Sequence, residues 1–177
     1  MRIVGGIYRS RIIVFPEDEM VRPTKDRIRE SIFNALSSDV IGRDVLDLFA
    51  GSGAYGLEAI SRGSKSVTFV DNYRKSIEAI KFNVNSLDIN SQSMVINTDY
   101  ASFLTSNSKQ FSLVFLDPPY RMDIYKDVIR KMEEKEIITS NAIIVCEADH
   151  QIDFKDLRFA SIKEYRYGEI FVFILRR

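Results

Sequence analysis

The chain has 177 residues, 45% of them hydrophobic and 28% charged, and its 25 basic and 25 acidic side chains cancel. This length predicts one domain, residues 1–177, and the neutral charge argues against a general nucleic-acid coating protein, which would be strongly basic. A single cysteine excludes an internal disulfide and a multi-cysteine zinc site. Because the sequence also lacks a long apolar run and a secretory signal, we expect a cytoplasmic protein without a membrane segment or a metal.

Residues 1–20 are predicted to form a β-hairpin extension ahead of a core of residues 21–177. Pro16 and the acidic residues that follow it interrupt the first extended stretch. Thr24 is a suitable N-cap for a helix that runs to about Leu36. The apolar positions of this segment fall on one face of such a helix, at Ile28, Ile32, Phe33 and Leu36.

Basic side chains cluster in these two N-terminal segments. Residues 1–15 contain three arginines and no acid, and residues 22–29 hold four basic side chains against Asp26 alone. Such a cluster is usually no more than a solvated surface, but it can also bind nucleic-acid phosphates in a protein of neutral net charge. The candidate RNA-binding residues are Arg2, Arg9, Arg11, Arg22 and Arg27, and Lys25 and Arg29 belong to the same cluster.

From Asp44 onward, short apolar runs alternate with helical stretches. The runs are 45–48, 66–70, 93–96, 113–116 and 142–146, and the clearest helix is 74–87. This alternation predicts an α/β fold with a doubly wound parallel sheet covered on both faces. Residues 158–167 and 169–175, joined at Gly168, predict an antiparallel hairpin that closes the sheet. Cys146 is expected to be a buried thiol.

A glycine-rich loop follows the first apolar run. Gly51, Gly53 and Gly56 form a G-x-G-x-x-G pattern that opens a helix. Glycines allow a tight turn and the close approach of a ligand to the backbone, and a helix N-terminus favours a negative ligand group. The pattern therefore predicts a nucleotide-type site, which could take a pyrophosphate or the carboxylate of a methionine moiety.

Three aspartates lie at the ends of the first three strands. Asp71 could accept hydrogen bonds from both hydroxyls of a ribose, or it could cap the next helix. Asp99 could meet an adenine amino group, or it could cap the helix that follows it. Asp47 precedes the glycines, where a carboxylate would repel a pyrophosphate and attract a sulfonium and an ammonium group. Asp47 therefore favours S-adenosylmethionine over a dinucleotide.

The tetrad Asp117-Pro118-Pro119-Tyr120 ends the fourth strand, at the edge where open α/β sheets bind ligands. The prolines fix φ and lack donors, which holds the backbone carbonyls rigidly outward. Hydrogen bonds from an exocyclic base amine to the Asp117 carboxylate and the Pro118 carbonyl would favour a pyramidal nitrogen, and positioning of this kind requires no general base. Tyr120 could stack on the extruded base. On its own the tetrad could equally be a rigid turn.

Together these features resemble the RsmD-like 16S ribosomal RNA guanine-N2 methyltransferases of bacteria, and the resemblance covers nearly the whole chain. The glycine loop and the tetrad occur in many amino-methyltransferases. The segment Arg-Pro-Thr-Lys-Asp-Arg-Ile-Arg-Glu at 22–30 is much more specific, and Arg-Ile-Val-Gly-Gly at 2–6 accompanies it. Two positions depart from the family pattern. Ser10 stands where glycine is usual, which puts the hairpin turn in question, and Asp71 replaces a commoner glutamate.

The resemblance implies a Rossmann-like class I S-adenosylmethionine-dependent methyltransferase. The implied fold has a seven-stranded, mostly parallel sheet, a C-terminal antiparallel hairpin, and an N-terminal hairpin that helps engage RNA. The implied substrate is guanine N2 in 16S ribosomal RNA on an assembling small ribosomal subunit. S-adenosylmethionine would lie against Asp47, Phe49, Gly51, Gly53, Asp71, Asp99 and Tyr100, and residues 117–120 would hold the target amine.

Three other functions remain open at this point. The tetrad also suits a DNA adenine-N6 methylase, although the chain has no room for a separate target-recognition domain. An NAD-dependent oxidoreductase fits the glycine loop, but little chain remains for a substrate domain. A non-catalytic RNA-binding assembly factor would need only the basic N-terminal cluster.

Overall fold

The computed structural model describes residues 1–16, 26–119 and 122–177. The helices are α1 (Asp26–Leu36), α2 (Ala54–Ser61), α3 (Arg74–Ser86), α4 (Tyr100–Ser106) and α5 (Tyr125–Glu134), with 3-10 turns at Ser37–Val40 and Asn90–Gln92. The strands are β1 (Asp44–Leu48), β2 (Ser66–Asp71), β3 (Ser93–Asn97), β4 (Phe111–Leu116), β5 (Ile138–Ala148), β6 (Ser161–Tyr167) and β7 (Ile170–Arg176). Every apolar run picked out in the sequence is part of a strand. The predicted N-cap Thr24 lies outside the described residues.

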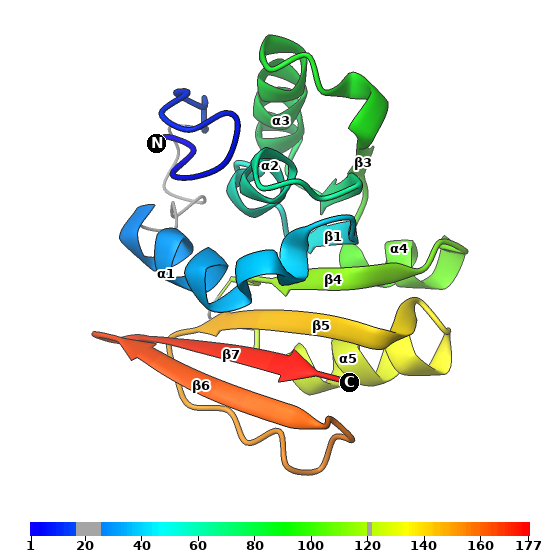
Figure 1. Ribbon diagram of the computed structural model, residues 1–177. Coiled ribbons are helices and arrows are strands. Elements are labelled where there is room, and N and C mark those ends of the chain that lie inside the picture. The colour runs from blue at the N-terminus through cyan, green and yellow to red at the C-terminus, as the bar shows by residue number, and fades with distance from the viewer. Residues whose placement is uncertain (17–25, 120–121) are drawn as a thin grey trace.

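The strands form one sheet in the order β3-β2-β1-β4-β5-β7-β6 (Figure 1). The first five strands are parallel, and β7 runs antiparallel to both β5 and β6. The chain moves outward from β1 to β3 and then crosses to β4 on the other side of β1. β1 and β4 are therefore neighbours at the point where the strand order reverses, which is where folds of this type bind ligands.

Helices cover both faces of the sheet, because side chains along each strand alternate between two buried clusters. Val45, Leu113 and Phe115 belong to the cluster beneath α1, α2 and α3. Their strand neighbours Leu46 and Val114 belong to the cluster beneath α4 and α5. This double coverage explains why the parallel strands read as continuous apolar runs in the sequence.

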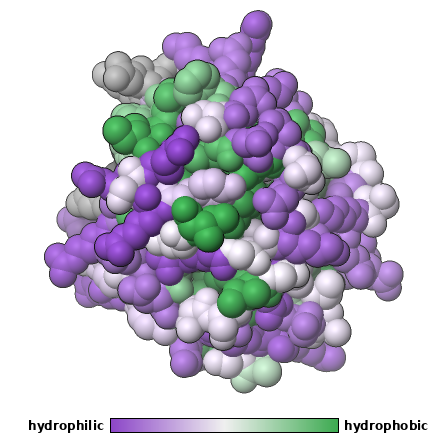
Figure 2. Space-filling view, turned by 45° about the horizontal axis from the view of Figure 1, so that its top comes forward, coloured by the Kyte–Doolittle hydropathy of each residue, from purple (hydrophilic) through white to green (hydrophobic). Residues whose placement is uncertain are grey.

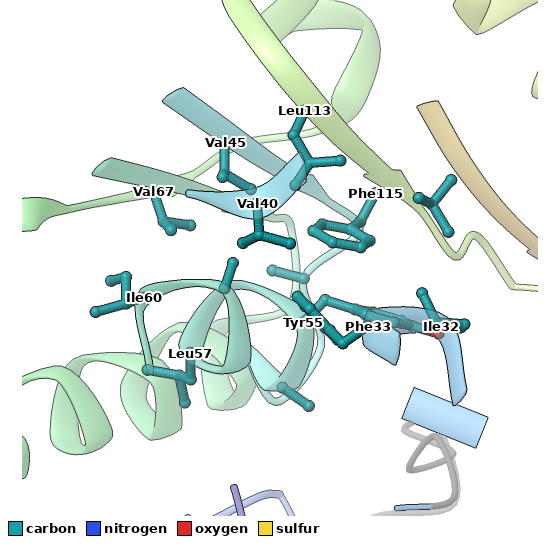
Figure 3. Packing of buried hydrophobic residues seen from close by; sticks show 14 of the residues in the cluster. Ile32, Phe33, Val40, Val45, Tyr55, Leu57, Ile60, Val67, Leu113 and Phe115 are labelled. Carbon is teal, nitrogen blue, oxygen red and sulfur yellow. The ribbon is translucent and has the colours of Figure 1, made fainter. Parts of the chain in front are cut away.

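The face beneath α1 and α2 contains an aromatic group that lies directly under the carboxyl edge of the sheet. The ring of Tyr55 stacks on that of Phe115, with centroids 4.8 Å apart and an interplanar angle of 13°. Phe33 of α1 packs against Phe115 at 5.4 Å (Figure 3). These three rings fix the first turn of α2 against β4.

Residues 1–16 fold back as a turn, but the predicted β-hairpin is wrong in one respect. Only Arg2 and Ile12 pair, in a single antiparallel bridge, and no regular strand forms on either side. Gly6 and Ser10 adopt φ values of 74° and 70°, which are incompatible with extended strands. The segment is a compact looped turn rather than a two-stranded ribbon.

This N-terminal turn packs on α2 and α3. The backbone N–H of Ile7 donates to the carbonyl of Ser61 at 2.8 Å. Val14 and the side chain of Asn83 exchange two hydrogen bonds, of 2.8 and 2.7 Å. A β-carbon on Gly6 would collide with the backbone carbonyl of Ser61, so this position requires glycine. Figure 1 shows the dark blue turn beside these two helices.

Within the described part of the chain, no helix is both long and apolar enough to cross a membrane. The predicted core thiol is confirmed, since Cys146 is fully buried and burial raises the pKa of its thiol.

Candidate active site

The glycine loop connects β1 to α2 in a tight left-handed path. Phe49, Gly51 and Gly53 have φ values of 71°, 52° and 76°, and Gly53 is the N-cap of α2. The backbone N–H groups of Phe49 and Ala50 both donate to the carbonyl of Val70, at 3.0 Å each, which fixes the loop to the end of β2. The left-handed turns explain the first two glycines of the motif.

The third glycine of the motif serves packing. A β-carbon on Gly56 would collide with the rings and methyls of Phe69 and Val67 on β2. Because Gly56 has no β-carbon, α2 can lie close to the sheet, which is the role expected of this position in a nucleotide-binding loop.

Asp47 lies beneath the glycine loop. The carboxylate is 2% exposed and accepts the backbone N–H of Gly56 at 2.9 Å. Burial raises the pKa of Asp47 to about 7, and the nearby charge of Asp71 adds to this effect, while the Gly56 hydrogen bond opposes it. A cationic ligand near this carboxylate would lower its pKa and be attracted in turn, whereas a pyrophosphate would be repelled.

Asp71 ends β2 and organises the loop. Its Oδ2 accepts the backbone N–H of Gly51 and its Oδ1 accepts that of Tyr73, both at 2.7 Å. Burial raises the pKa of Asp71, and the two backbone hydrogen bonds oppose this rise. The N-cap of α3 is Tyr73, without a side-chain capping bond, so Asp71 does not cap that helix and its bond to Tyr73 N–H is a local turn ahead of it. Its carboxylate still offers further lone pairs to ribose hydroxyls.

Asp99 is the N-cap of α4. It accepts the backbone N–H of Ser102 at 2.9 Å and the hydroxyl of Ser102 at 2.7 Å, and these hydrogen bonds lower its pKa. The next residue, Tyr100, packs its ring against Phe49 with centroids 5.3 Å apart. The structure therefore brings two predicted donor-site residues, one from the glycine loop and one from the start of α4, into a single aromatic pair.

The Asp117-Pro118-Pro119 segment follows β4 directly. Asp117 is half-buried, Pro118 is buried and Pro119 is exposed, so the segment passes from the sheet to the surface. Leu116, the last residue of β4, pairs in register with Leu48 at the end of β1. The tetrad and the glycine loop thus leave neighbouring strands at the same edge of the sheet. Tyr120, the predicted stacking residue, lies outside the described residues.

Two residues at this edge were not predicted from the sequence. Glu147, near the end of β5, is 4% exposed, and its Oε2 accepts the hydroxyl of Tyr55 at 2.5 Å. The sequence does contain a signal, because Glu147 follows the apolar run 142–146 just as Asp117 follows the run 113–116. Tyr55 carries no such signal, since it reads as an ordinary buried aromatic residue of a helix.

The candidate RNA-binding arginines that the structure describes all lie on the surface. Arg2, Arg9, Arg11 and Arg27 are exposed. The guanidinium of Arg11 donates to the carbonyl of Ser86 at 3.3 Å, and Arg2 lies 3.8 Å from a carboxylate oxygen of Asp26. Arg22 lies outside the described residues.

Arg29 does not belong to the basic surface, contrary to the sequence-based interpretation. Its side chain is fully buried, and its Nη2 donates to Asp26 at 2.9 Å and to the backbone carbonyl of Arg2. Its Nε lies 3.6 Å from Glu58, which also accepts from Arg62 at 2.7 Å. Because a buried charge requires partners, this cluster ties the N-terminal turn to α1 and α2.

No group of three histidine, cysteine, aspartate or glutamate side chains is placed to hold a metal ion in the regions that the structure describes. The carboxylates and the aromatic pair at the ends of β1 to β3 suit a ligand that has a cationic centre and an aromatic portion. The segment after β4 could hold the polar group of a second ligand next to it.

Comparisons with known proteins place the chain in a family. Residues 1–176 match the family model described as conserved hypothetical protein 95. The ribosomal RNA small subunit methyltransferase D of Escherichia coli is 34% identical over 84% of this chain and 75% of its own length. The protein of the same name from Haemophilus influenzae is 36% identical over 84% of this chain and 79% of its own length.

Solved structures extend the comparison to three dimensions. The Escherichia coli protein yhhF superposes with a TM-score of 0.89 and 31% identity, covering 100% of this chain and 97% of that one. The 16S rRNA N2 G1207 methyltransferase (RsmC) of Thermus thermophilus, solved with AdoMet and guanosine, has a TM-score of 0.72 at 18% identity, covering 92% of this chain and 45% of that one. At 18% identity, the similarity to RsmC concerns the fold alone. The predicted class I methyltransferase fold is confirmed.

Proposed function

This chain belongs to the conserved hypothetical protein 95 family, and on that premise we propose that it transfers a methyl group from S-adenosylmethionine to the exocyclic N2 amine of a guanine in 16S ribosomal RNA. Relatives above 30% identity that are named small subunit ribosomal RNA methyltransferases support the reaction and the class of RNA. The choice of guanine N2 rests on the resemblance described above and on the chemistry of the site.

The observation that carries the proposal is the adjacency of two loops. The glycine loop leaves β1, and Asp117-Pro118-Pro119 leaves β4, directly beside it in the sheet. A donor bound at the first loop and an amine held at the second would meet above the same sheet edge. Direct methyl transfer depends mainly on such positioning.

The donor-site residues fit S-adenosylmethionine. Bound there, it would supply an electrophilic methyl group on a sulfonium centre. Asp47 and Asp71 are carboxylates whose pKa values burial has raised, so a cationic ligand would relieve the cost of their ionisation. Gly51 and Gly53 give the backbone its left-handed path at the start of α2, where a helix N-terminus favours a carboxylate, and the Phe49–Tyr100 pair offers aromatic surface to an adenine.

On the acceptor side, Asp117 and the carbonyl of Pro118 would accept the two N–H groups of the amine. These bonds turn the nitrogen lone pair out of the ring plane and toward the methyl group. The new C–N bond would form as the methyl–sulfur bond breaks, with that bond's electron pair left on a neutral thioether. One N–H proton of the amine then becomes acidic and leaves toward the Asp117 carboxylate or water. Tyr120 is proposed to stack on the base.

The RNA surface is proposed to run over the N-terminal turn, where Arg2, Arg9, Arg11 and Arg27 are exposed. On the face drawn in Figure 2, hydrophobic side chains lie in small groups among hydrophilic ones.

The test is labelled-methyl transfer from S-adenosylmethionine to 16S ribosomal RNA, small ribosomal subunits and DNA, followed by nucleoside analysis. We expect N2-methylguanosine from RNA or the subunit and no label in DNA. Label in DNA adenine would replace the proposal with an N6-adenine methylase. Binding of NADH without binding of S-adenosylmethionine would replace it with an oxidoreductase.

A further inference from the structure

Glu147 is a buried carboxylate that has no role in the transfer proposed above. Its Oε2 accepts the hydroxyl of Tyr55 at 2.5 Å, and the hydroxyl of Tyr125 donates to its backbone carbonyl at 2.7 Å. Two tyrosines from two different helices thus fix both its side chain and its backbone. A buried, oriented carboxylate near a ligand site is a candidate functional group.

The sheet register places Glu147 beside the amine-binding segment. Leu116 of β4 pairs with Cys146 of β5 in a parallel register. Asp117 and Glu147, the next residue on each strand, therefore lie next to each other, on backbones about 4.8 Å apart.

The two side chains also point to the same face of the sheet. Phe115 and Val145 belong to the buried cluster beneath α1 and α2. Because strand side chains alternate with a period of two, Asp117 and Glu147 are directed to that same side. Two carboxylates on adjacent strands therefore flank one position at the carboxyl edge.

Tyr55 determines how the Glu147 carboxylate is turned. Its ring stacks on that of Phe115 (Figure 3). The hydroxyl therefore has a fixed position from which to donate to Glu147. The bond from Tyr55 therefore orients the carboxylate at the end of β5.

Guanine and adenine differ next to the amine that is methylated. In guanine the ring N1 carries a hydrogen and lies beside the N2 amine, whereas in adenine the ring N1 is an acceptor beside the N6 amine. Asp117 and a proline carbonyl can hold either amine. A second carboxylate beside them can accept a hydrogen bond from the ring N1 of guanine, but not from the ring N1 of adenine.

We propose that Glu147 accepts the N1–H of the target guanine while Asp117 and Pro118 hold its N2 amine, and that Glu147 thereby selects guanine. This inference rests on the proposed function and assigns base selection to the end of β5. If the base has an unprotonated N1, as adenine does, this nitrogen and the Glu147 carboxylate are both acceptors and would face each other where water has little access. A site that buries two unpaired acceptors in this way rejects the wrong base strongly.

The test uses two matched RNA substrates that differ only at the methylated position. One carries guanine, and the other carries 2-aminopurine, which keeps the 2-amine but has an acceptor at N1. For the wild-type protein we expect kcat/KM to favour guanine by about 100-fold or more. Glu147→Gln should narrow this preference to about 10-fold or less, because the amide can donate to the N1 of 2-aminopurine.

Glu164→Gln is the matched control, since Glu164 is exposed on the edge strand β6. This variant should keep the wild-type preference. Equal transfer to both RNAs by the wild-type protein would overturn the inference without reference to any variant. An equal loss on both RNAs in Glu147→Gln would also overturn it, because it would assign the residue a purely structural role.

The same assay separates this inference from the proposed function. If the wild-type protein transfers no methyl group to guanine in any RNA or particle, the proposed function fails and the inference fails with it. If guanine is methylated but the preference over 2-aminopurine is absent, only the role of Glu147 fails.

Discussion

At the residue scale, Asp47 combines a structural bond with an unusual ionisation. Burial raises the pKa of its carboxyl group to about 7, although it accepts the backbone N–H of Gly56. Between about pH 4 and pH 7 the folded chain therefore retains a proton that the unfolded chain has released. Asp47 thus makes the free energy of unfolding fall as the pH rises through this window.

Asp47→Asn should remove this dependence. The amide cannot ionise, and its oxygen can still accept from Gly56, so the stability of the variant relative to wild type should grow from pH 4 to pH 7 and then level off. The relative free energy of unfolding can grow by at most about 4 kcal/mol, because the pKa rises from 3.8 to about 7 and each pKa unit corresponds to about 1.36 kcal/mol. Urea unfolding at several pH values measures it, and a constant difference across the range would contradict the assignment.

Asp117 offers a residue-scale test of the chemistry. Asp117→Asn keeps the shape of the side chain but can present an amide N–H group to the substrate amine instead of an acceptor. We expect kcat to fall by about 100-fold or more, while the melting temperature and the affinity for S-adenosylmethionine change little. Single-turnover methyl transfer measures the loss. Asp127→Asn, exposed on α5, is the control and should retain full activity.

At the element scale, the N-terminal turn shows how one residue shapes a segment. Ser10 has φ of 70°, a left-handed conformation that is costly for a residue with a β-carbon. This geometry favours glycine at the position. The turn forms with serine because its backbone is held by the hydrogen bond from Ser10 N–H to the carbonyl of Ile3 at 2.8 Å.

Ser10→Gly should therefore stabilise the protein by about 1 kcal/mol, because it relieves the left-handed strain. The free energy of urea unfolding is the measurement. Ser140→Gly tests the opposite case, since Ser140 lies within strand β5 and glycine is unfavourable there. A loss of stability in Ser10→Gly would show that the hydroxyl matters more than the backbone strain.

The attachment of the N-terminal turn to the core depends on Arg29. Arg29→Met would leave the buried Glu58 without one of its two cationic partners and remove the bond to the carbonyl of Arg2. We expect a loss of about 3 kcal/mol in the free energy of unfolding. Arg74→Met breaks an exposed pair with Glu78 and should cost less than about 1 kcal/mol. Similar losses in both variants would exclude an anchoring role for Arg29.

At the scale of the whole molecule, the neutral net charge limits how tightly the protein can hold RNA by phosphate contacts alone. A ribosomal particle would add protein contacts to those phosphate contacts. We therefore expect a higher kcat/KM on small ribosomal subunits than on naked 16S ribosomal RNA. Equal values on the two substrates would refute a preference for the particle.

The exposed arginines should account for the salt dependence of RNA binding. Arg9→Ala should weaken binding similarly for different RNA sequences and reduce the slope of log K against log salt by about 1. Stability should not change, because Arg9 is exposed. Filter binding at several salt concentrations measures the slope, and an unchanged slope would remove Arg9 from the RNA surface.

The sequence by itself determined the parallel sheet, its C-terminal hairpin, the glycine loop and the position of residues 117–119. These features depend on neighbours in the chain: apolar runs of strand length, turn glycines, and prolines that fix their own φ. Strands that are buried on both faces appear as continuous apolar runs, so they can be recognised in the sequence without knowledge of the fold.

Only the tertiary structure decided which side chains meet. Tyr55 and Glu147 are 92 positions apart in the sequence and share a hydrogen bond, and Arg29 is buried although its segment reads as a basic surface. Burial and contact of this kind depend on strand register and on which helix covers which face. These are properties of pairs of distant segments, and no local pattern encodes them.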